Sequence, residues 1–147
     1  MDPCQRLVLE RSYTALHDAP LDRAALGSSL TGVFLGFAGT EFSQVLAASP
    51  AGCSVYAATR SASSIASGRL SYVLGLHGPC VSYDTACSSA LSACHGGLRA
   101  LQLNECTAGL GLGVRVVANQ IHPTQRVAVP PPFRIFTSVG LWDRARR

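Results

Sequence analysis

The sequence predicts an α/β fold in which helices pack against a buried sheet. Segments whose apolar residues recur at helical spacing alternate with short apolar segments bounded by glycine, and this alternation favours α/β layers over an all-α or all-β fold. The chain has 147 residues, close to the usual size of one domain. Hydrophobic residues make up 48% of it and charged residues 14%, so we expect a core of ordinary size.

The first helix is expected to begin at Asp2 and Pro3 and to end before Pro20. Asp2 is a favourable N-cap, Pro3 fits the first turn, and Gln5 occupies the position of a capping-box partner. Pro20 cannot continue a helix. Between these limits, three apolar side chains recur at helical spacing: Leu9, Tyr13 and Leu16.

Further helices and strands are expected in the middle of the chain. The strands are expected at residues 31–36, 80–83 and 108–117, and the helices at residues 42–48, 61–74 and 88–103. In the helix at 61–74, Gly68 would permit close packing. In the helix at 88–103, four side chains are predicted to share one apolar face: Leu91, Cys94, Leu98 and Leu101.

The last residues of the chain lack the regular helix and strand patterns of the residues before them. We expect residues 1–122 to form one partial domain and residues 123–147 to be a divergent tail. The three prolines of residues 130–132 block regular structure, and residues 133–147 have no clean period.

Charge and hydropathy exclude two classes of partner. The net charge is +4, every cationic residue is Arg, and these residues are scattered apart from Arg144, Arg146 and Arg147, so no nucleic-acid face is expected. No run of eighteen apolar residues predicts a membrane helix, and no basic stretch followed by an apolar one predicts a signal peptide. The expected location is the cytoplasm.

Six cysteines raise the question of disulfides or zinc, and their spacing argues against both. They contain no C-x-x-C pair, and no pair of histidines completes a metal site. We therefore expect no metal, reduced thiols, and mostly small buried side chains. The six are Cys4, Cys53, Cys80, Cys87, Cys94 and Cys106.

Cys87 lies where a predicted strand ends and a predicted helix begins. A thiol in this position is close to the positive end of the helix dipole, which favours the nucleophilic thiolate, and close to free backbone N–H groups that stabilise an oxyanion. Its small neighbours Ala86, Ser88 and Ser89 leave room for a substrate. The pattern alone leaves two interpretations open, a nucleophile and a core residue.

The segment Asp84-Thr85-Ala86-Cys87-Ser88-Ser89 resembles the active-site motif of the β-ketoacyl synthase domains of modular polyketide synthases. The resemblance extends over about residues 1–118, in blocks that keep the family's order. These blocks are residues 1–10 (MDPCQRLVLE), 31–36 (TGVFLG), 56–59 (YAAT), 68–79 (GRLSYVLGLHGP) and 104–106 (NEC).

The resemblance implies a thiolase-like α/β/α layered fold, of which this chain is the N-terminal part. It implies that Cys87 is the nucleophile that accepts an acyl group and that its backbone N–H is an oxyanion donor. The acyl group would then condense with a decarboxylating malonyl unit on an acyl carrier protein, in polyketide or fatty acid biosynthesis. Phosphopantetheine would come from the carrier protein, and no cofactor would be bound by the chain itself.

The sequence departs from the family in its histidines. Two family histidines needed for condensation lie in His-Gly-Thr-Gly-Thr and Lys-Ser-Asn-x-Gly-His motifs, which are absent here, and the chain contains no Lys. His95 follows Cys87 by eight residues, roughly 12 Å along a helix, which is too far for a nucleophile–base pair. His17, His77 and His122 lie in no recognisable motif. We therefore expect this chain alone to load an acyl group without completing condensation.

Two other functions remain open. The resemblance implies that the strand Cys80–Tyr83 lies at a homodimer interface, so the chain could be a non-catalytic piece that acts in dimerisation or interaction. A cysteine hydrolase ranks last, because the sequence places no histidine near Cys87.

Overall fold

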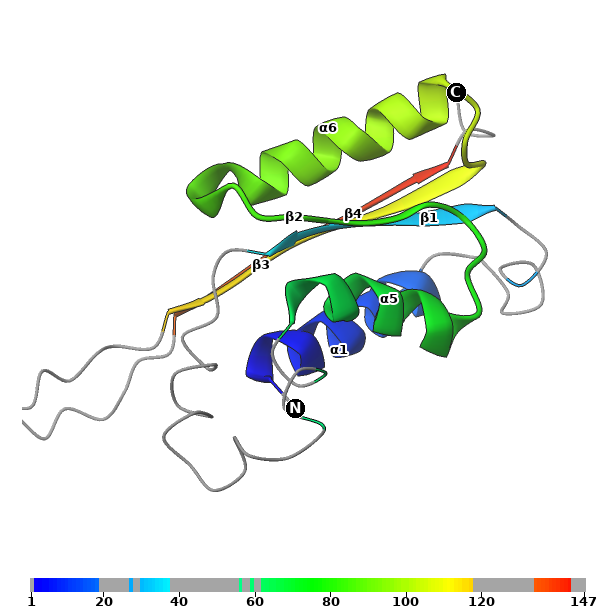
Figure 1. The fold of residues 1–147 in the computed structure, drawn as a ribbon. Coiled ribbons are helices and arrows are strands. Elements are labelled where there is room, and N and C mark those ends of the chain that lie inside the picture. Colours follow the sequence, from blue (N-terminus) through cyan, green and yellow to red (C-terminus); the bar gives the residue numbers. More distant parts are fainter. Residues whose placement is uncertain are drawn as a thin grey trace, which may run out of the picture.

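A four-stranded sheet with helices on both faces forms the centre of the molecule (Figure 1). The computed structural model describes residues 2–18, 27, 30–37, 56, 59, 62–117 and 134–143. Helices α1 (Pro3–Asp18) and α5 (Ser63–Leu74) cover one face, and α6 (Ser89–Gln102) covers the other. The predicted α/β/α layering is therefore confirmed.

The strands follow the order β2-β1-β3-β4, with β1 and β3 in the middle. β1 is parallel to both β2 and β3, whereas β4 is antiparallel to β3. All seven residues of β1 are buried, as expected for a strand in a parallel sheet with both faces covered. The strand bounds are Thr31–Phe37 for β1, Cys80–Tyr83 for β2, Ala108–Val117 for β3 and Arg134–Asp143 for β4.

α1 begins and ends where the sequence predicts. The Asp2 carboxylate accepts a hydrogen bond from the Cys4 N–H at 2.7 Å, which confirms the predicted N-cap. The capping-box role of Gln5 is wrong, because its buried Oε1, which would accept from the N-cap N–H, has no hydrogen-bond partner. Its Nε2 donates instead to the Ala62 carbonyl at 3.3 Å. Tyr13 is 64% exposed and lies outside the buried face of this helix, which consists of Cys4, Gln5, Val8, Ser12 and Leu16.

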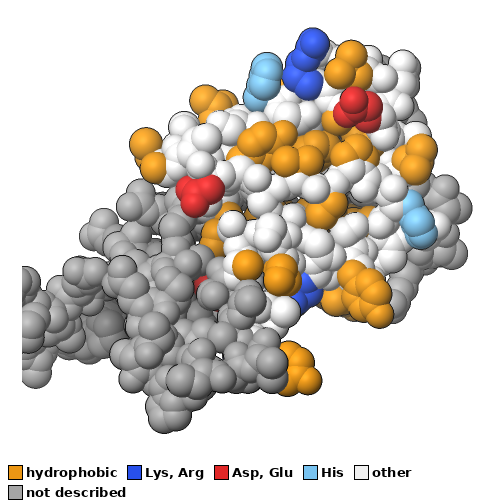
Figure 2. Space-filling view, viewed as in Figure 1, with side chains coloured by type: hydrophobic (Ala, Val, Ile, Leu, Met, Phe, Trp, Pro, Cys, Tyr) orange, Lys and Arg blue, Asp and Glu red, His pale blue; other side chains and the backbone are white. Residues whose placement is uncertain are grey.

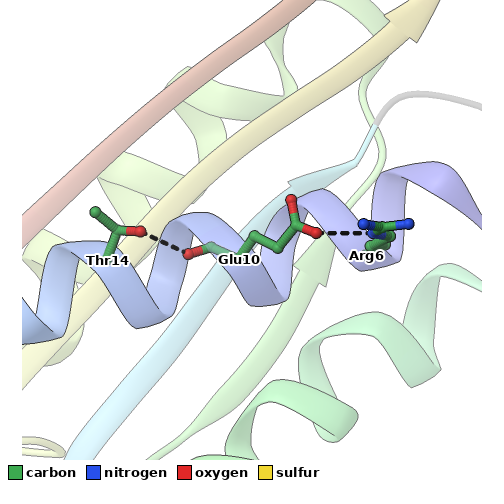
Figure 3. A network of polar contacts seen from close by, with 3 residues as sticks. All are labelled: Arg6, Glu10 and Thr14. Carbon is green, nitrogen blue, oxygen red and sulfur yellow. Dashed lines mark hydrogen bonds and ion pairs between the residues drawn. The ribbon is translucent and has the colours of Figure 1, made fainter.

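The outer surface of α1 carries a local polar network (Figure 3). Arg6 Nε and Glu10 Oε1 form an ion pair at 2.7 Å, and the Thr14 hydroxyl donates to the Glu10 carbonyl at 3.0 Å. Both charged side chains are more than half exposed, so this pair is a minor source of stability.

Two apolar clusters fill the layers on either side of the sheet. The larger lies between the sheet and the pair α1 and α5, and the smaller lies under α6. α5 ends at Gly75, whose left-handed φ of 67° suits a glycine C-cap. Gly68 is exposed, and a Cβ added to it would meet nothing within 4 Å, so the predicted close packing at this glycine is wrong.

α6 buries a different face from the predicted one. Leu91 is 74% exposed, Leu98 is 39% exposed and Cys94 is half-buried, so of the four predicted residues only Leu101 is buried. The buried residues are Ser89, Ala93, Gly97, Ala100 and Leu101. Small side chains face the sheet because α6 packs very close to it. Hydrophobic side chains form a band beside α6 on the face shown in Figure 2.

β4 was not predicted from the sequence. It pairs with β3 along the whole of both strands, from Ala108 opposite Asp143 to Val117 opposite Arg134. The boundary predicted at residue 122 stays a prediction, and the helix predicted at 42–48 lies outside the described residues. Within the described part of the chain, no helix is long and apolar enough to cross a membrane.

Candidate active site

Cys87 lies in a tight turn between the end of β2 and the start of α6. β2 ends at Tyr83, and a single 3₁₀ turn, η2 (Ala86–Ser88), precedes α6. The thiol-bearing residue is exposed and occupies the middle of η2. The strand-to-helix junction predicted for Cys87 is therefore present, with a 3₁₀ turn in place of a direct helix start.

Ala86 gives this turn its sharpness. Its φ is +53°, in the left-handed region that costs a residue with a Cβ roughly 1–2 kcal/mol. A non-glycine residue keeps such a conformation only where its surroundings hold it. The hydrogen bonds of the turn explain what holds Ala86 there.

The Ser89 hydroxyl binds two peptide groups of the turn. It accepts a hydrogen bond from the Thr85 N–H at 2.8 Å and donates one to the Ala86 carbonyl at 2.8 Å. The Ser89 backbone N–H also donates to the Ala86 carbonyl. Ser89 is only 3% exposed, so water does not readily replace these bonds.

A second set of hydroxyls lies on the exposed side of the turn. The Ser88 hydroxyl is within 2.8 Å of the Thr85 carbonyl oxygen and 3.0 Å of the Thr85 hydroxyl. The Thr85 hydroxyl is also 3.2 Å from the Ser92 hydroxyl. Thr85 is thus held from both sides, and Asp84, which is exposed, links it to β2.

Gly36 at the end of β1 allows α6 to begin directly above the sheet. A Cβ on Gly36 would lie 2.6 Å from the Ser89 carbonyl carbon and 2.7 Å from the Ala90 nitrogen, which are backbone atoms. Farther along α6, a Cβ on Gly96 would collide with the Tyr83 ring. This role of Gly36 was not predicted from the sequence, although a glycine at the end of a buried strand is a signal of close backbone approach.

The sequence matches the β-ketoacyl synthase N-terminal domain over residues 1–128. The chain belongs to this family. It is 45% identical over 137 residues to the spectinabilin polyketide synthase system protein NorC of Streptomyces orinoci, covering 91% of this chain and 6% of that protein. It is 47% identical over 118 residues to the polyketide synthase GfsE of Streptomyces halstedii, covering 80% of this chain and 3% of that protein.

Solved structures agree with this assignment. The ketosynthase domain OzmH KS7 of the oxazolomycin system of Streptomyces albus JA3453 matches with a TM-score of 0.69 and 35% identity, covering 79% of this chain and 20% of that one. The ketosynthase from module 6 of the bacillaene synthase of Bacillus subtilis 168, in its C167S mutant form, matches with a TM-score of 0.68 and 32% identity, covering 80% of this chain and 19% of that one.

These matches confirm the predicted thiolase-like α/β fold and the predicted correspondence to the N-terminal part of a ketosynthase domain of a polyketide synthase. The chain spans about a fifth of the length of the solved ketosynthases and a few per cent of the polyketide synthases it matches.

The cysteines of this ketosynthase segment differ in exposure. Of the five that the structure describes, only Cys4 and Cys106 are buried, so the expectation of mostly buried cysteines is wrong for these residues. Burial raises the pKa of the Cys106 thiol above its ordinary value of 9.0. Cys80 is exposed like Cys87, and Cys53 lies outside the described residues.

The described histidines lie on separate elements. His17 lies in the last turn of α1 with its ring centroid 6.2 Å from that of Tyr13, His77 is exposed after α5, and His95 is exposed on α6. Among the described residues, no hydrogen bond joins a histidine to Cys87. The described residues also contain no group of three or more His, Cys, Asp or Glu side chains that could hold a metal ion.

Proposed function

We propose that this ketosynthase segment accepts an acyl group on Cys87. One observation carries the proposal: Cys87 is exposed at the tip of a turn that holds Ala86 in a strained conformation just before a helix. Strained backbone of this kind is concentrated at functional sites. The free N–H groups at the helix start can donate hydrogen bonds to the oxyanion that forms when a thioester is attacked.

The acyl transfer would exchange one thioester for another. The Cys87 thiolate attacks the carbonyl carbon of the incoming thioester and forms a new C–S bond. The oxygen carries the negative charge in the intermediate, and the Cys87 N–H stabilises it by donating a hydrogen bond. The bond to the departing sulfur then breaks, and the departing thiolate takes up the proton that the Cys87 thiol had released.

In the whole ketosynthase domain, the acyl group on Cys87 would next be joined to a malonyl unit on an acyl carrier protein. The malonyl carboxylate leaves as CO₂, the resulting carbanion attacks the acyl carbon, and the Cys87 thiolate is released. Phosphopantetheine on the carrier protein would hold the malonyl unit. The two histidine motifs of the family are absent from these 147 residues, so we propose that this chain alone performs only the loading step.

The loading step is testable by mass spectrometry. Incubating the chain with an acyl thioester should give an intact-mass adduct of one acyl group, and Cys87→Ala should abolish it. Cys80→Ala is the matched control, because Cys80 is also exposed and its loss should leave the adduct unchanged. Absence of any adduct on Cys87 would contradict the proposal, and Cys87-dependent release of free acid would indicate thioester hydrolysis instead.

A second candidate is a dimerisation piece without catalysis. β2 is at the edge of the sheet, and its residues Cys80 and Val81 are exposed. An exposed edge strand offers unpaired N–H and C=O groups to another chain. The mass of the chain in solution tests this candidate.

A further inference from the structure

We propose that Ser89 is a positioning residue that sets the direction of the Cys87 N–H. The inference rests on the proposed function, in which this N–H stabilises the oxyanion during acyl transfer. Ser89 does not need to touch the substrate for this role. It acts through the Ala86 carbonyl, to which both its hydroxyl and its backbone N–H donate hydrogen bonds.

Peptide geometry connects Ser89 to Cys87. The Ala86 carbonyl and the Cys87 N–H belong to the same trans peptide group, which is planar, so they point in opposite directions. Two hydrogen bonds hold the carbonyl toward Ser89, and the Cys87 N–H is therefore directed away from Ser89. The hydrogen bonds that form η2 run from the Ser88 and Ser89 N–H groups, which leaves the Cys87 N–H available to a ligand.

The same hydroxyl also keeps the turn closed. It accepts the Thr85 N–H while it donates to the Ala86 carbonyl, so a single oxygen joins the peptide groups before Thr85 and after Ala86. The left-handed φ of +53° is unfavourable for Ala86, which has a Cβ. Loss of the two hydrogen bonds of the Ser89 hydroxyl would let Ala86 leave this conformation. The Ser89 backbone is in turn fixed against Gly36 of β1, so the hydroxyl starts from a fixed point.

Comparing two reactions of Cys87 distinguishes a misdirected Cys87 N–H from a general loss of thiol reactivity or of folded structure. Attack on a thioester builds an oxyanion and needs the N–H, whereas alkylation by iodoacetamide displaces iodide and builds no oxyanion. Removing an oxyanion donor slows acyl transfer by about 10²–10³-fold, and we expect a misdirected donor to cost about tenfold. Ser89→Ala should therefore lower the ratio of acylation rate to alkylation rate at Cys87 by about tenfold.

Ser67→Ala is the matched control. Ser67 is 2% exposed, and its hydroxyl donates to the carbonyl three residues earlier, as that of Ser89 does, but it lies on α5. Its loss should leave the ratio at Cys87 unchanged. Both rates are measured on the full chain by peptide mass spectrometry, with far-UV circular dichroism to check the fold.

The outcomes distinguish the inference from the function on which it rests. If the unsubstituted chain takes no acyl group on Cys87, the proposed function and this inference both fail. If it is acylated and Ser89→Ala leaves the ratio unchanged, only the positioning role is overturned. Should Ser89→Ala not fold, Ser89→Cys takes its place, because a thiol of similar size is a weak donor and acceptor and should lower the ratio in the same direction. An unchanged ratio in that variant overturns the role equally.

Discussion

At the scale of single residues, glycine decides how closely α6 approaches the sheet. Gly36 lies in register with Tyr83, the last residue of β2, and Ser89 at the start of α6 packs on it. Without this contact, the turn that presents Cys87 would lie farther from the end of β1. Gly36 therefore belongs to the support of the site, although it is remote from it in sequence.

Alanine at two glycines should have opposite effects on stability. Gly36→Ala places a Cβ against backbone atoms of Ser89 and Ala90, which cannot swing aside, and should lower the free energy of unfolding by about 2 kcal/mol. Gly68→Ala adds a methyl group in open space within α5 and should raise it by about 1 kcal/mol. Urea unfolding of both variants measures the difference, and equal shifts of the same sign would contradict this account.

Residue positions were predictable where a local rule sets them. The Asp2 N-cap and the placement of Cys87 at a strand–helix junction depend on neighbouring residues only, and both are present. The hydrogen bond from Gln5 to Ala62 joins residues 57 positions apart, and no pattern in the sequence near Gln5 reveals it. The hydrogen bonds of Ser89 were missed for a related reason, because its presence in the motif indicates only a small side chain.

At the scale of secondary structure elements, α6 shows why an apolar face is not always a buried face. Its existence was predicted from spacing and its bounds differ by one residue at each end. The predicted buried face of α6 was wrong. A hydropathy pattern places the leucines inside because they are more hydrophobic than alanine, glycine and serine, whereas the small residues are the ones that face the sheet. The space between α6 and the sheet is so narrow that only small side chains fit along most of it. This spacing is set by residues of the sheet, such as Gly36, and the sequence of α6 does not reveal it.

Two leucines of α6 test this orientation. Leu101 is 6% exposed and packs in the cluster under α6, so Leu101→Ala should lower the free energy of unfolding by about 3 kcal/mol. Leu91 is 74% exposed, and Leu91→Ala should change it by less than about 0.5 kcal/mol. Equal losses in urea unfolding would mean that Leu91 is buried after all.

At the scale of the whole molecule, the α/β layering was predictable and the sheet was not. Alternation of helices and strands fixes the layers, but the order of strands depends on contacts between distant segments. β4 is the clearest case. It pairs with β3, from which it is separated in the sequence by residues 118–133, and its own residues show no regular alternation of apolar and polar side chains. Its addition leaves β2 at one edge of the sheet and β4 at the other.

The edge at β2 gives a prediction about assembly. If β2 pairs with β2 of a second chain, sedimentation velocity should show a dimer, and Val81→Lys should convert it to a monomer because a charge on an edge strand opposes pairing. Val81 is suitable because it is 37% exposed on that strand. The exposed leucines of α6 offer a competing route to association, so Leu91→Gln is the matched control and should leave a β2 dimer intact. A monomeric unsubstituted chain would contradict pairing through β2, and a dimer that only Leu91→Gln disrupts would assign the interface to α6.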